Sequence, residues 1–286
     1  MSGAGQDRPG GFLLVDKPSG MTSHDVVDVV RRALATRKVG HAGTLDPMAT
    51  GLLVVGVGRA TRLLRFFGDL TKTYEGTARL GVETDTLDAE GTVVRSADVE
   101  VSRLELERAF AARLGVSEQR PPAYSAVKVG GRKLYEAARA GAPLEAPARP
   151  IRVDAFEVRA FDGTDVDFLV TCSGGTYVRA LLADVGAGLG CGAHLTRLRR
   201  SAIGPYRVED AVAPAAVAAP APVEAAVAHL ARVDLQPDEA RAASNGSILA
   251  PAGLDGPYGV FAPGGRLIGI YRDTGAKARP EVILAG

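Results

Sequence analysis

Short apolar runs and alternating stretches dominate the pattern of hydrophobic and polar positions along the chain. Residues 11–15 and 52–55 are continuous apolar runs, which are typical of buried strands. Residues 72–81 and 166–172 alternate between apolar and polar positions, as strands with one buried face do. Strands and helices do not alternate regularly enough to predict a doubly wound parallel sheet.

Helical periodicity is confined to a few segments. The valines at positions 26, 27 and 30 fall on one helical face, and Ser23 is the predicted N-cap of this helix. Residues 101–114 predict a surface helix capped by Ser102. We expect two further helices, at 60–67 and from 177 to about 185.

The C-terminal part differs in composition. Residues 211–226 are rich in alanine and proline and predict a connector between two domains. Beyond it, apolar runs at 260–262 and 267–271 flank a Pro-Gly-Gly turn, which predicts a β-hairpin. Residues 280–284 are expected to add a last strand.

Composition limits the class of protein. The chain has 286 residues, is 46% hydrophobic and carries a formal net charge of +1, which allows one large domain and a small one. A charge so near zero means that any contact with RNA must come from a local basic surface. Cys172 and Cys191 belong to no CxxC pair, so neither a disulfide scaffold nor a zinc site is expected.

Other common sites are also absent from the sequence. The Gly-x-Gly at 56–58 lacks the third glycine of a dinucleotide fingerprint. The acidic stretch 83–91 does not keep the spacing of an EF-hand loop and is expected to be a turn between strands. The N-terminus does not resemble a signal peptide and no apolar run is long enough to span a bilayer, so we expect a cytoplasmic protein with no membrane partner.

The most informative stretch is residues 40–53, in which Asp46 is followed by proline and lies between Gly43 and Gly51. Pro47 biases Asp46 away from helix, and the glycines allow turns or close approaches that other residues resist. This arrangement can present one carboxylate to a ligand. It can equally be a simple turn, because Asp before Pro is a common turn start.

A basic segment at 119–152, called here the insertion, contains seven basic and two acidic residues. Frequent prolines and glycines predict loops, and Tyr124 and Tyr135 lie between the cations. Cations for phosphates and rings for bases are what an RNA-binding loop needs. The alternative is an ordinary solvated hairpin.

A third candidate site is the turn at 173–176, between a predicted strand and a predicted helix. Free backbone N–H groups at a helix N-terminus can bind an anion. An ordinary strand-to-helix turn has the same sequence features.

Four blocks of the sequence resemble motifs of the TruB-type pseudouridine synthases. The first two are Asp16-Lys17-Pro18-x-Gly20-x-Thr22-Ser23 and Gly40-His41-x-Gly43-Thr44-Leu45-Asp46-Pro47. The others are Gly175-Thr176-Tyr177-Val178-Arg179 and the segment 193–201. They occur in the order of the family, and the resemblance covers roughly residues 11–204.

This resemblance implies a fold and a domain division. It implies an α+β fold with a mostly antiparallel central sheet flanked by helices, with the basic insertion 119–152 as a loop that grips the substrate. Residues 1–210 would form the catalytic domain and 211–228 a linker. Residues 229–286 would form a small β-rich domain of the PUA type, which they match only in size and strand content.

The resemblance also assigns roles to individual residues. Asp46 is the expected catalytic carboxylate, Arg179 its partner, and Tyr74 the ring that stacks on the target base. The remaining expected substrate contacts are Lys17, His41, Tyr124, Lys128, Arg132, Tyr177, Leu198, Arg199 and Arg200. Lys17 has two further interpretations, as a support for the Asp46 loop and as a solvated turn residue.

The implied function is isomerisation of uridine 55 in the T loop of tRNA to pseudouridine, by a monomeric enzyme. The sequence offers no site for a metal, and we expect no metal, nucleotide or other cofactor. Two alternatives stay open: an RNA-binding or tRNA-folding protein on the same scaffold, and a synthase that modifies another structured RNA.

Overall fold

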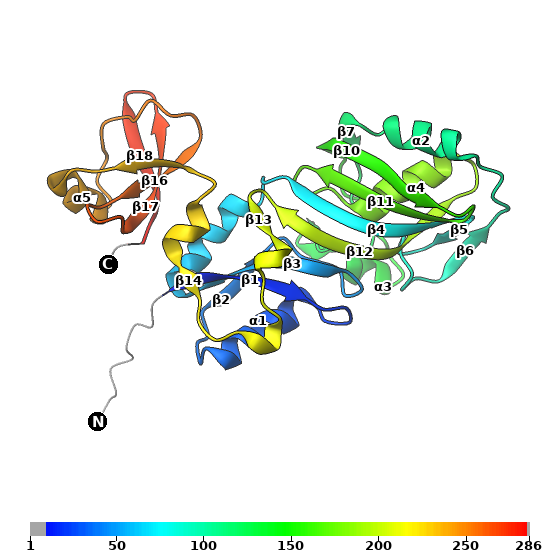
Figure 1. The fold of residues 1–286 in the computed structure, drawn as a ribbon, viewed down its shortest axis with the longest axis horizontal. Coiled ribbons are helices and arrows are strands. Elements are labelled where there is room, and N and C mark those ends of the chain that lie inside the picture. Colours follow the sequence, from blue (N-terminus) through cyan, green and yellow to red (C-terminus); the bar gives the residue numbers. More distant parts are fainter. Residues whose placement is uncertain (1–9, 285–286) are drawn as a thin grey trace.

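The computed structural model describes residues 10–284, and one large sheet forms its centre (Figure 1). The strands follow the order β14-β1-β3-β12-β4-β11-β10-β7, with β2 paired to β3 and β13 to β12. Among the strand pairings of this sheet in residues 10–284, only β3–β12 is parallel. The α+β fold with a mostly antiparallel sheet is confirmed. The strands are β1 (Gly11–Lys17), β2 (Val39–Ala42), β3 (Thr50–Val57), β4 (Lys72–Leu80), β7 (Gly115–Gln119), β10 (Arg149–Phe161), β11 (Asp165–Cys172), β12 (Ala193–Ile203), β13 (Tyr206–Arg207) and β14 (Ala221–Pro222).

Strand β12 joins two halves of the sheet, one formed by β14, β1, β3 and β2 and the other by β4, β11, β10 and β7. It pairs along most of its length with β4 but touches β3 only where Arg199 and Arg200 face Thr50 and Gly51. Gly51 has φ +101°, and a Cβ there would lie 2.3 Å from the carbonyl oxygen of Arg200. Only glycine therefore allows the two strands to approach this closely.

Helices cover the two halves separately. Helices α2 (Arg103–Ala111) and α4 (Val178–Gly188) pack on the half that contains β4, β10 and β11, and share its hydrophobic core. Helix α1 (Ser23–Ala33) packs against β1, β2 and β3 through its valines. The 3₁₀ helix η1 (Gly58–Phe67) follows β3 directly.

The helix N-caps agree with the sequence in one case and differ in another. Ser102 caps α2 in a capping box with Glu105, as predicted. The cap of α1 is Thr22 and not Ser23, because the Thr22 side chain accepts from the backbone of Asp25 while Ser23 turns inward. Residues 58–67 are helical but form a 3₁₀ helix.

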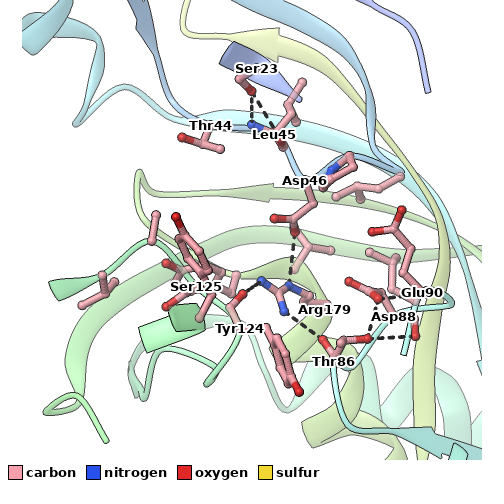
Figure 2. Close-up of a pocket in the computed structure, with 18 of the residues that line it drawn as sticks. Ser23, Thr44, Leu45, Asp46, Thr86, Asp88, Glu90, Tyr124, Ser125 and Arg179 are labelled. Atoms are coloured by element: carbon pink, nitrogen blue, oxygen red, sulfur yellow. Dashed lines mark hydrogen bonds and ion pairs between the residues drawn. The ribbon is translucent and has the colours of Figure 1, made fainter. Parts of the chain in front are cut away.

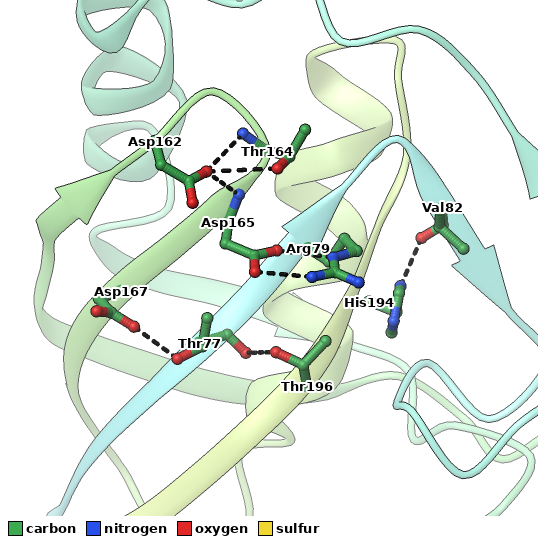
Figure 3. Close-up of polar contacts among 9 residues, drawn as sticks. All are labelled: Thr77, Arg79, Val82, Asp162, Thr164, Asp165, Asp167, His194 and Thr196. Carbon is green, nitrogen blue, oxygen red and sulfur yellow. Dashed lines mark hydrogen bonds and ion pairs between the residues drawn. The ribbon is translucent and has the colours of Figure 1, made fainter.

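Polar contacts between strands add to the pairing of β4, β11 and β12 (Figure 3). Arg79 donates two hydrogen bonds to Asp165, and Thr77 donates to Asp167. His194 lies 2.9 Å from the carbonyl oxygen of Val82. These contacts help to fix the strand register.

Two small hairpins and a short helix project from the sheet. Hairpin β5 (Val82–Thr84)–β6 (Val93–Ser96) follows β4, and the turn between these strands carries Leu87 at φ +65°. The insertion forms hairpin β8 (Lys128–Val129)–β9 (Arg132–Lys133), which leads into α3 (Leu134–Arg139). The insertion is therefore folded rather than an open loop, and it ends in the first residues of β10.

A second sheet, of four strands in the order β15-β16-β17-β18, forms a separate lobe next to η1 (Figure 1). The predicted hairpin and last strand are both confirmed. The elements are β15 (Ala231–Asp234), α5 (Pro237–Ser244), β16 (Pro257–Phe261), β17 (Leu267–Thr274) and β18 (Lys277–Ile283).

The segment between the lobes follows the large sheet. Val212 exchanges backbone hydrogen bonds with Leu14 and Asp16 of β1, and β14 pairs with β1. The short 3₁₀ helices η2 (Val208–Asp210), η3 (Pro214–Ala216) and η4 (Val223–Val227) lie along this path. The predicted division into domains at 210 and 228 stays a prediction. No helix among the described residues is long and apolar enough to cross a membrane.

Candidate active site

The Asp46 loop is held from three sides. Ser23 exchanges hydrogen bonds with both backbone groups of Leu45, and the backbone N–H of Gly20 donates to the carbonyl of Pro47. The Nζ of Lys17 also donates to Pro47, at 3.1 Å. The backbone on either side of Asp46 is therefore fixed, while 37% of its side chain stays exposed.

Arg179 is the partner of Asp46. Its Nε lies 3.2 Å from Oδ2 of Asp46, and its side chain is 4% exposed (Figure 2). Two carbonyls orient the guanidinium: Nη1 donates to Thr86 at 2.8 Å and Nη2 to Tyr124 at 2.6 Å. Because Nε makes no hydrogen bond, its contact with Asp46 is an ion pair whose geometry is set by the two Nη groups.

Asp46 and Arg179 face a cleft of about 1010 Å³ between the large sheet, the β5–β6 turn and the insertion. Eight of the predicted site residues line this cleft. They are His41, Asp46, Tyr74, Tyr124, Tyr177, Arg179, Leu198 and Arg200. Six of these eight come from the second, third and fourth motifs, and Thr22 and Ser23 of the first motif also line the cleft.

Apolar and aromatic groups form the wall beside the ion pair. Tyr74 and Leu198 are each 7% exposed. Burial raises the pKa of Tyr74 above its ordinary value, so this phenol is neutral at physiological pH. The Tyr177 ring contacts two guanidinium groups, with Arg149 5.2 Å and Arg179 5.7 Å from its centroid. Such a wall suits a flat, neutral ring.

Opposite charges line different parts of the cleft. The insertion and the start of β10 contribute Lys133, Arg139 and Arg149, whereas the turn after β5 contributes Asp88 and Glu90. Burial, followed by the charges of Asp88 and Asp46, raises the pKa of Glu90. A polyanion would meet the basic wall and be repelled by the acidic one, which gives the cleft a preferred orientation for its ligand.

His41 lies in the cleft wall on β2. Burial, together with the charge of Arg200, lowers its pKa, so the imidazole is neutral near pH 7. Its Nδ1 is buried and makes no hydrogen bond to any described residue. Within residues 10–284, no three His, Cys, Asp or Glu side chains form a group that could hold a metal ion.

Three predicted substrate contacts have partners within the protein. Lys17 is fully buried and its ammonium donates to the carbonyls of Pro18, Met21 and Pro47, so it supports the Asp46 loop and cannot reach a phosphate. Arg199 does not line the cleft, because it forms a bidentate pair with Asp16.

Arg200 lines the cleft but is only 1% exposed. It donates to the carbonyls of Leu52 and Gly43, so its guanidinium braces the Asp46 loop instead of lying along an RNA backbone. Neighbouring residues of a strand point to opposite faces, which explains why Arg199 and Arg200 cannot share one role.

Two further predicted contacts lie outside the cleft. Lys128 and Arg132 are exposed on the β8–β9 hairpin and do not line it. The cations of the insertion that do line it, Lys133 and Arg139, are not among the predicted substrate contacts, and neither is Arg149 at the start of β10. Their alternation with Tyr135 was the available signal. The carbonyl of Thr86 left no signal, because any residue type supplies one.

Three family models match consecutive parts of the chain. The model described as TruB family pseudouridylate synthase (N terminal domain) matches residues 31–178. The chain belongs to the TruB family of pseudouridine synthases. Two further models of TruB-type proteins, the tRNA pseudouridylate synthase B C-terminal domain and the tRNA Pseudouridine synthase II C terminal, match residues 179–222 and 230–285.

Individual TruB relatives are similar over nearly the full chain. The tRNA pseudouridine synthase B of Mycolicibacterium paratuberculosis is 49% identical, covering 96% of this chain and 98% of the relative. That of Thermobifida fusca is 48% identical, covering 96% and 99%.

Solved structures share the fold. The Cbf5-Nop10-Gar1 complex contains a chain with a TM-score of 0.74 and 25% identity, covering 96% of this chain and 84% of that one. An H/ACA RNP bound to a substrate RNA containing 2'-deoxyuridine contains a chain with a TM-score of 0.73 and 24% identity, covering 96% and 85%.

Proposed function

We propose that this protein converts uridine 55 in the T loop of tRNA to pseudouridine, with Asp46 as the essential carboxylate. The observation that carries the proposal is the pair formed by a partly exposed Asp46 and a buried Arg179 in a cleft with an apolar, aromatic wall. Relatives named tRNA pseudouridine synthase B, 48–49% identical over nearly the full chain, support tRNA as the substrate.

The reaction exchanges one bond to the sugar for another. The bond from N1 of uracil to C1' of ribose breaks, a bond from C5 to C1' forms, C5 loses its hydrogen and N1 gains a proton. No electrons are gained or lost. One carboxylate can serve this sequence by attacking C1', by attacking the base or by removing a proton from the sugar.

Arg179 would act by orientation and charge. Its two Nη bonds fix the guanidinium, so Asp46 meets a cation at a set position before substrate arrives. Substrate that fills the cleft excludes water and strengthens this interaction. Removing Arg179 would leave Asp46 mobile and its charge unbalanced in the closed site.

The target base must leave its stack to reach Asp46, which costs a few kcal/mol. Packing of the uracil ring against Tyr74, Tyr177 and Leu198 would offset that cost. The neutral ring of His41, which is half-buried and lines the cleft, would pack against the RNA.

The insertion would grip the T arm through Lys133, Arg139 and Arg149, with Tyr124 and Tyr135 beside the bases. Lys128 and Arg132 would meet more distant phosphates. We further propose that the enzyme acts as a monomer in the cytoplasm without a cofactor, that residues 1–210 form its catalytic domain, and that 229–286 are PUA-like.

Release of the C5 hydrogen tests the proposal. Transcripts of tRNA that carry tritium at uracil C5 are incubated with wild type, Asp46→Asn and the matched surface variant Asp69→Asn, which lies outside the cleft. We expect wild type and Asp69→Asn to release tritium and Asp46→Asn to release none. From a U55C transcript, in which position 55 is not uridine, wild type should release none.

The same assay separates the alternatives. Binding of tRNA without release by wild type would mean an RNA-binding or RNA-folding protein. Undiminished release from the U55C transcript would mean that another uridine is the target.

A further inference from the structure

Gln119 is the last residue of β7 and the first of the insertion, and it is only 4% exposed. Its side-chain amide both donates a hydrogen bond to the backbone of Tyr177 and accepts one from it. The Nε2 group donates to the Tyr177 carbonyl at 3.0 Å, and Oε1 accepts from the Tyr177 N–H at 2.8 Å. A side chain 58 positions earlier in the chain thus fixes the residue from which α4 begins.

Helix α4 lacks the local interactions that usually stabilise a helix N-terminus. Its N-cap residue is Tyr177, which makes no side-chain capping bond, and no acidic residue lies in its first turn. The second residue of the helix is instead Arg179, a cation at the end of the helix that disfavours positive charge. The start of α4 therefore depends on contacts from elsewhere in the protein.

Gln119 supplies the missing contact at the backbone, because it satisfies the N–H of Tyr177 that would otherwise be unpaired. Two residues further on, Arg179 is held by the Thr86 and Tyr124 carbonyls and lies 3.2 Å from Asp46. Tyr124 and Gln119 both belong to the insertion, so this one segment fixes both the start of the helix and the guanidinium that projects from it.

We propose that Gln119 is a positioning residue for the reaction: its amide sets the start of α4 and, through it, the placement of Arg179 against Asp46. The proposal rests on the roles given above to Asp46 and Arg179. It links the root of the substrate-gripping insertion to the ion pair, with no contact between Gln119 and the substrate.

Two substitutions separate the two hydrogen bonds. Gln119→Met keeps the shape of the side chain and loses both bonds, and we expect its single-turnover rate on tRNA to fall about 10–100-fold, as small misplacements of a catalytic group do. Its Kd for tRNA should stay within about twofold of wild type. Glu118→Met, on the neighbouring exposed residue, is the matched control and should keep the wild-type rate.

Gln119→Glu gives the decisive measurement. An ionised carboxylate can accept from the Tyr177 N–H but cannot donate to the Tyr177 carbonyl, whereas a protonated carboxyl group does both, as the amide does. Burial raises the pKa of a carboxyl group at this position, and the guanidinium of Arg149, its partner across the β7–β10 pair, acts in the opposite direction. The rate of Gln119→Glu relative to wild type, taken per folded molecule at each pH because an ionised buried carboxylate also lowers stability, should therefore rise as the pH is lowered from 8 to 5.5.

The outcomes are distinct. A rate for Gln119→Met within twofold of wild type, or a pH-independent ratio for Gln119→Glu, would overturn the inference, provided that wild type is active and Asp46→Asn is not. If wild type itself is inactive on tRNA, the proposed function fails. A crystal structure of Gln119→Met then decides separately: displacement of Arg179 supports the positioning role, and an unchanged Arg179–Asp46 distance refutes it.

Discussion

The Nζ atom of Lys17 lies 3.1 Å from the carbonyl oxygen of Pro47, the residue that directly follows Asp46. Lys17 also donates to the carbonyls of Pro18 and Met21, so one buried ammonium ties the end of β1 and the turn after it to the Asp46 loop. The cation supports the carboxylate through the backbone rather than by contact with it.

Loss of this support should affect both stability and activity. Lys17→Met would leave buried carbonyls without a donor. We expect its free energy of unfolding, measured in urea, to be about 2–4 kcal/mol lower than that of wild type. Activity should fall even in the folded fraction, because Asp46 is no longer fixed. Lys38→Met, on an exposed lysine, should change neither quantity, and equal behaviour of the two variants would contradict this role.

Gly51 and Gly20 allow conformational strain to be separated from steric clash. Both have positive φ, but a Cβ at Gly51 would meet Arg200 backbone atoms at 2.3–3.0 Å, whereas a Cβ at Gly20 has nothing within 4 Å. Gly20→Ala should therefore lose only about 1–2 kcal/mol of stability. Gly51→Ala should lose more than about 3 kcal/mol, because β3 and β12 must also separate. Urea unfolding of both variants checks this order.

The salt dependence of tRNA binding should distinguish cations that line the cleft from those that do not. Each phosphate contact contributes about 0.7–0.9 to the slope of log K against log salt. Arg139→Gln and Lys133→Gln, in the cleft, should each reduce the slope by about that amount.

Arg132→Gln and Lys128→Gln, on the exposed hairpin, are the matched controls and should reduce the slope less. Equal slopes for the four variants would mean that the hairpin contributes as much as the cleft.

Asp273 stabilises the small sheet in a pH-dependent way. It accepts from the Tyr258 hydroxyl at 2.6 Å and from the backbone N–H groups of Ala252, Gly253 and Leu254. These hydrogen bonds lower the pKa of Asp273 below its ordinary value of about 3.9, and the bond from Tyr258 has the largest effect. The ionised carboxylate therefore stabilises the fold above that pH, and its contribution is lost as the pH falls through the folded-state pKa.

Asp273→Asn should accordingly lower the thermal midpoint by a few degrees at pH 7. The difference from wild type should shrink once the pH is brought below about 3.9. Asp255→Asn, on an exposed residue, serves as the control. A difference that does not change with pH would show that the carboxylate charge is not the cause.

The sequence predicted most strands that carry a clear pattern, and missed those that carry none. Strand β4 alternates over nine residues and was found, whereas β10 was missed. Its register shifts between Val153 and Ala155 and again between Val158 and Ala160, which breaks the period of two on which recognition of a strand depends. The N-cap of α1 was misplaced by one residue because Thr22 and Ser23 are both good capping residues and only tertiary contacts choose between them.

The site was predictable where a motif fixes a side chain, and less so where the fold decides its direction. Asp46, Tyr74 and Arg179 meet in the cleft as the motifs imply. Arg199 and Arg200 look equivalent in the sequence, yet one pairs with Asp16 and the other is buried under the Asp46 loop. Their orientation follows from strand register, which no local pattern of charges contains.

The central position of β12 has a consequence for the time at which a working site can exist. Within residues 10–284, β12 is the strand through which the two halves of the large sheet are hydrogen-bonded, and it begins at residue 193. A ribosome adds about 5–20 residues per second, so β12 is synthesised roughly 7–30 s after Asp46. Until β12 is made, Asp46 and Tyr74 belong to two halves of the sheet that are not hydrogen-bonded to each other. A nascent chain that ends before β12 therefore contains both residues of the ion pair, Asp46 and Arg179, but cannot assemble the active site.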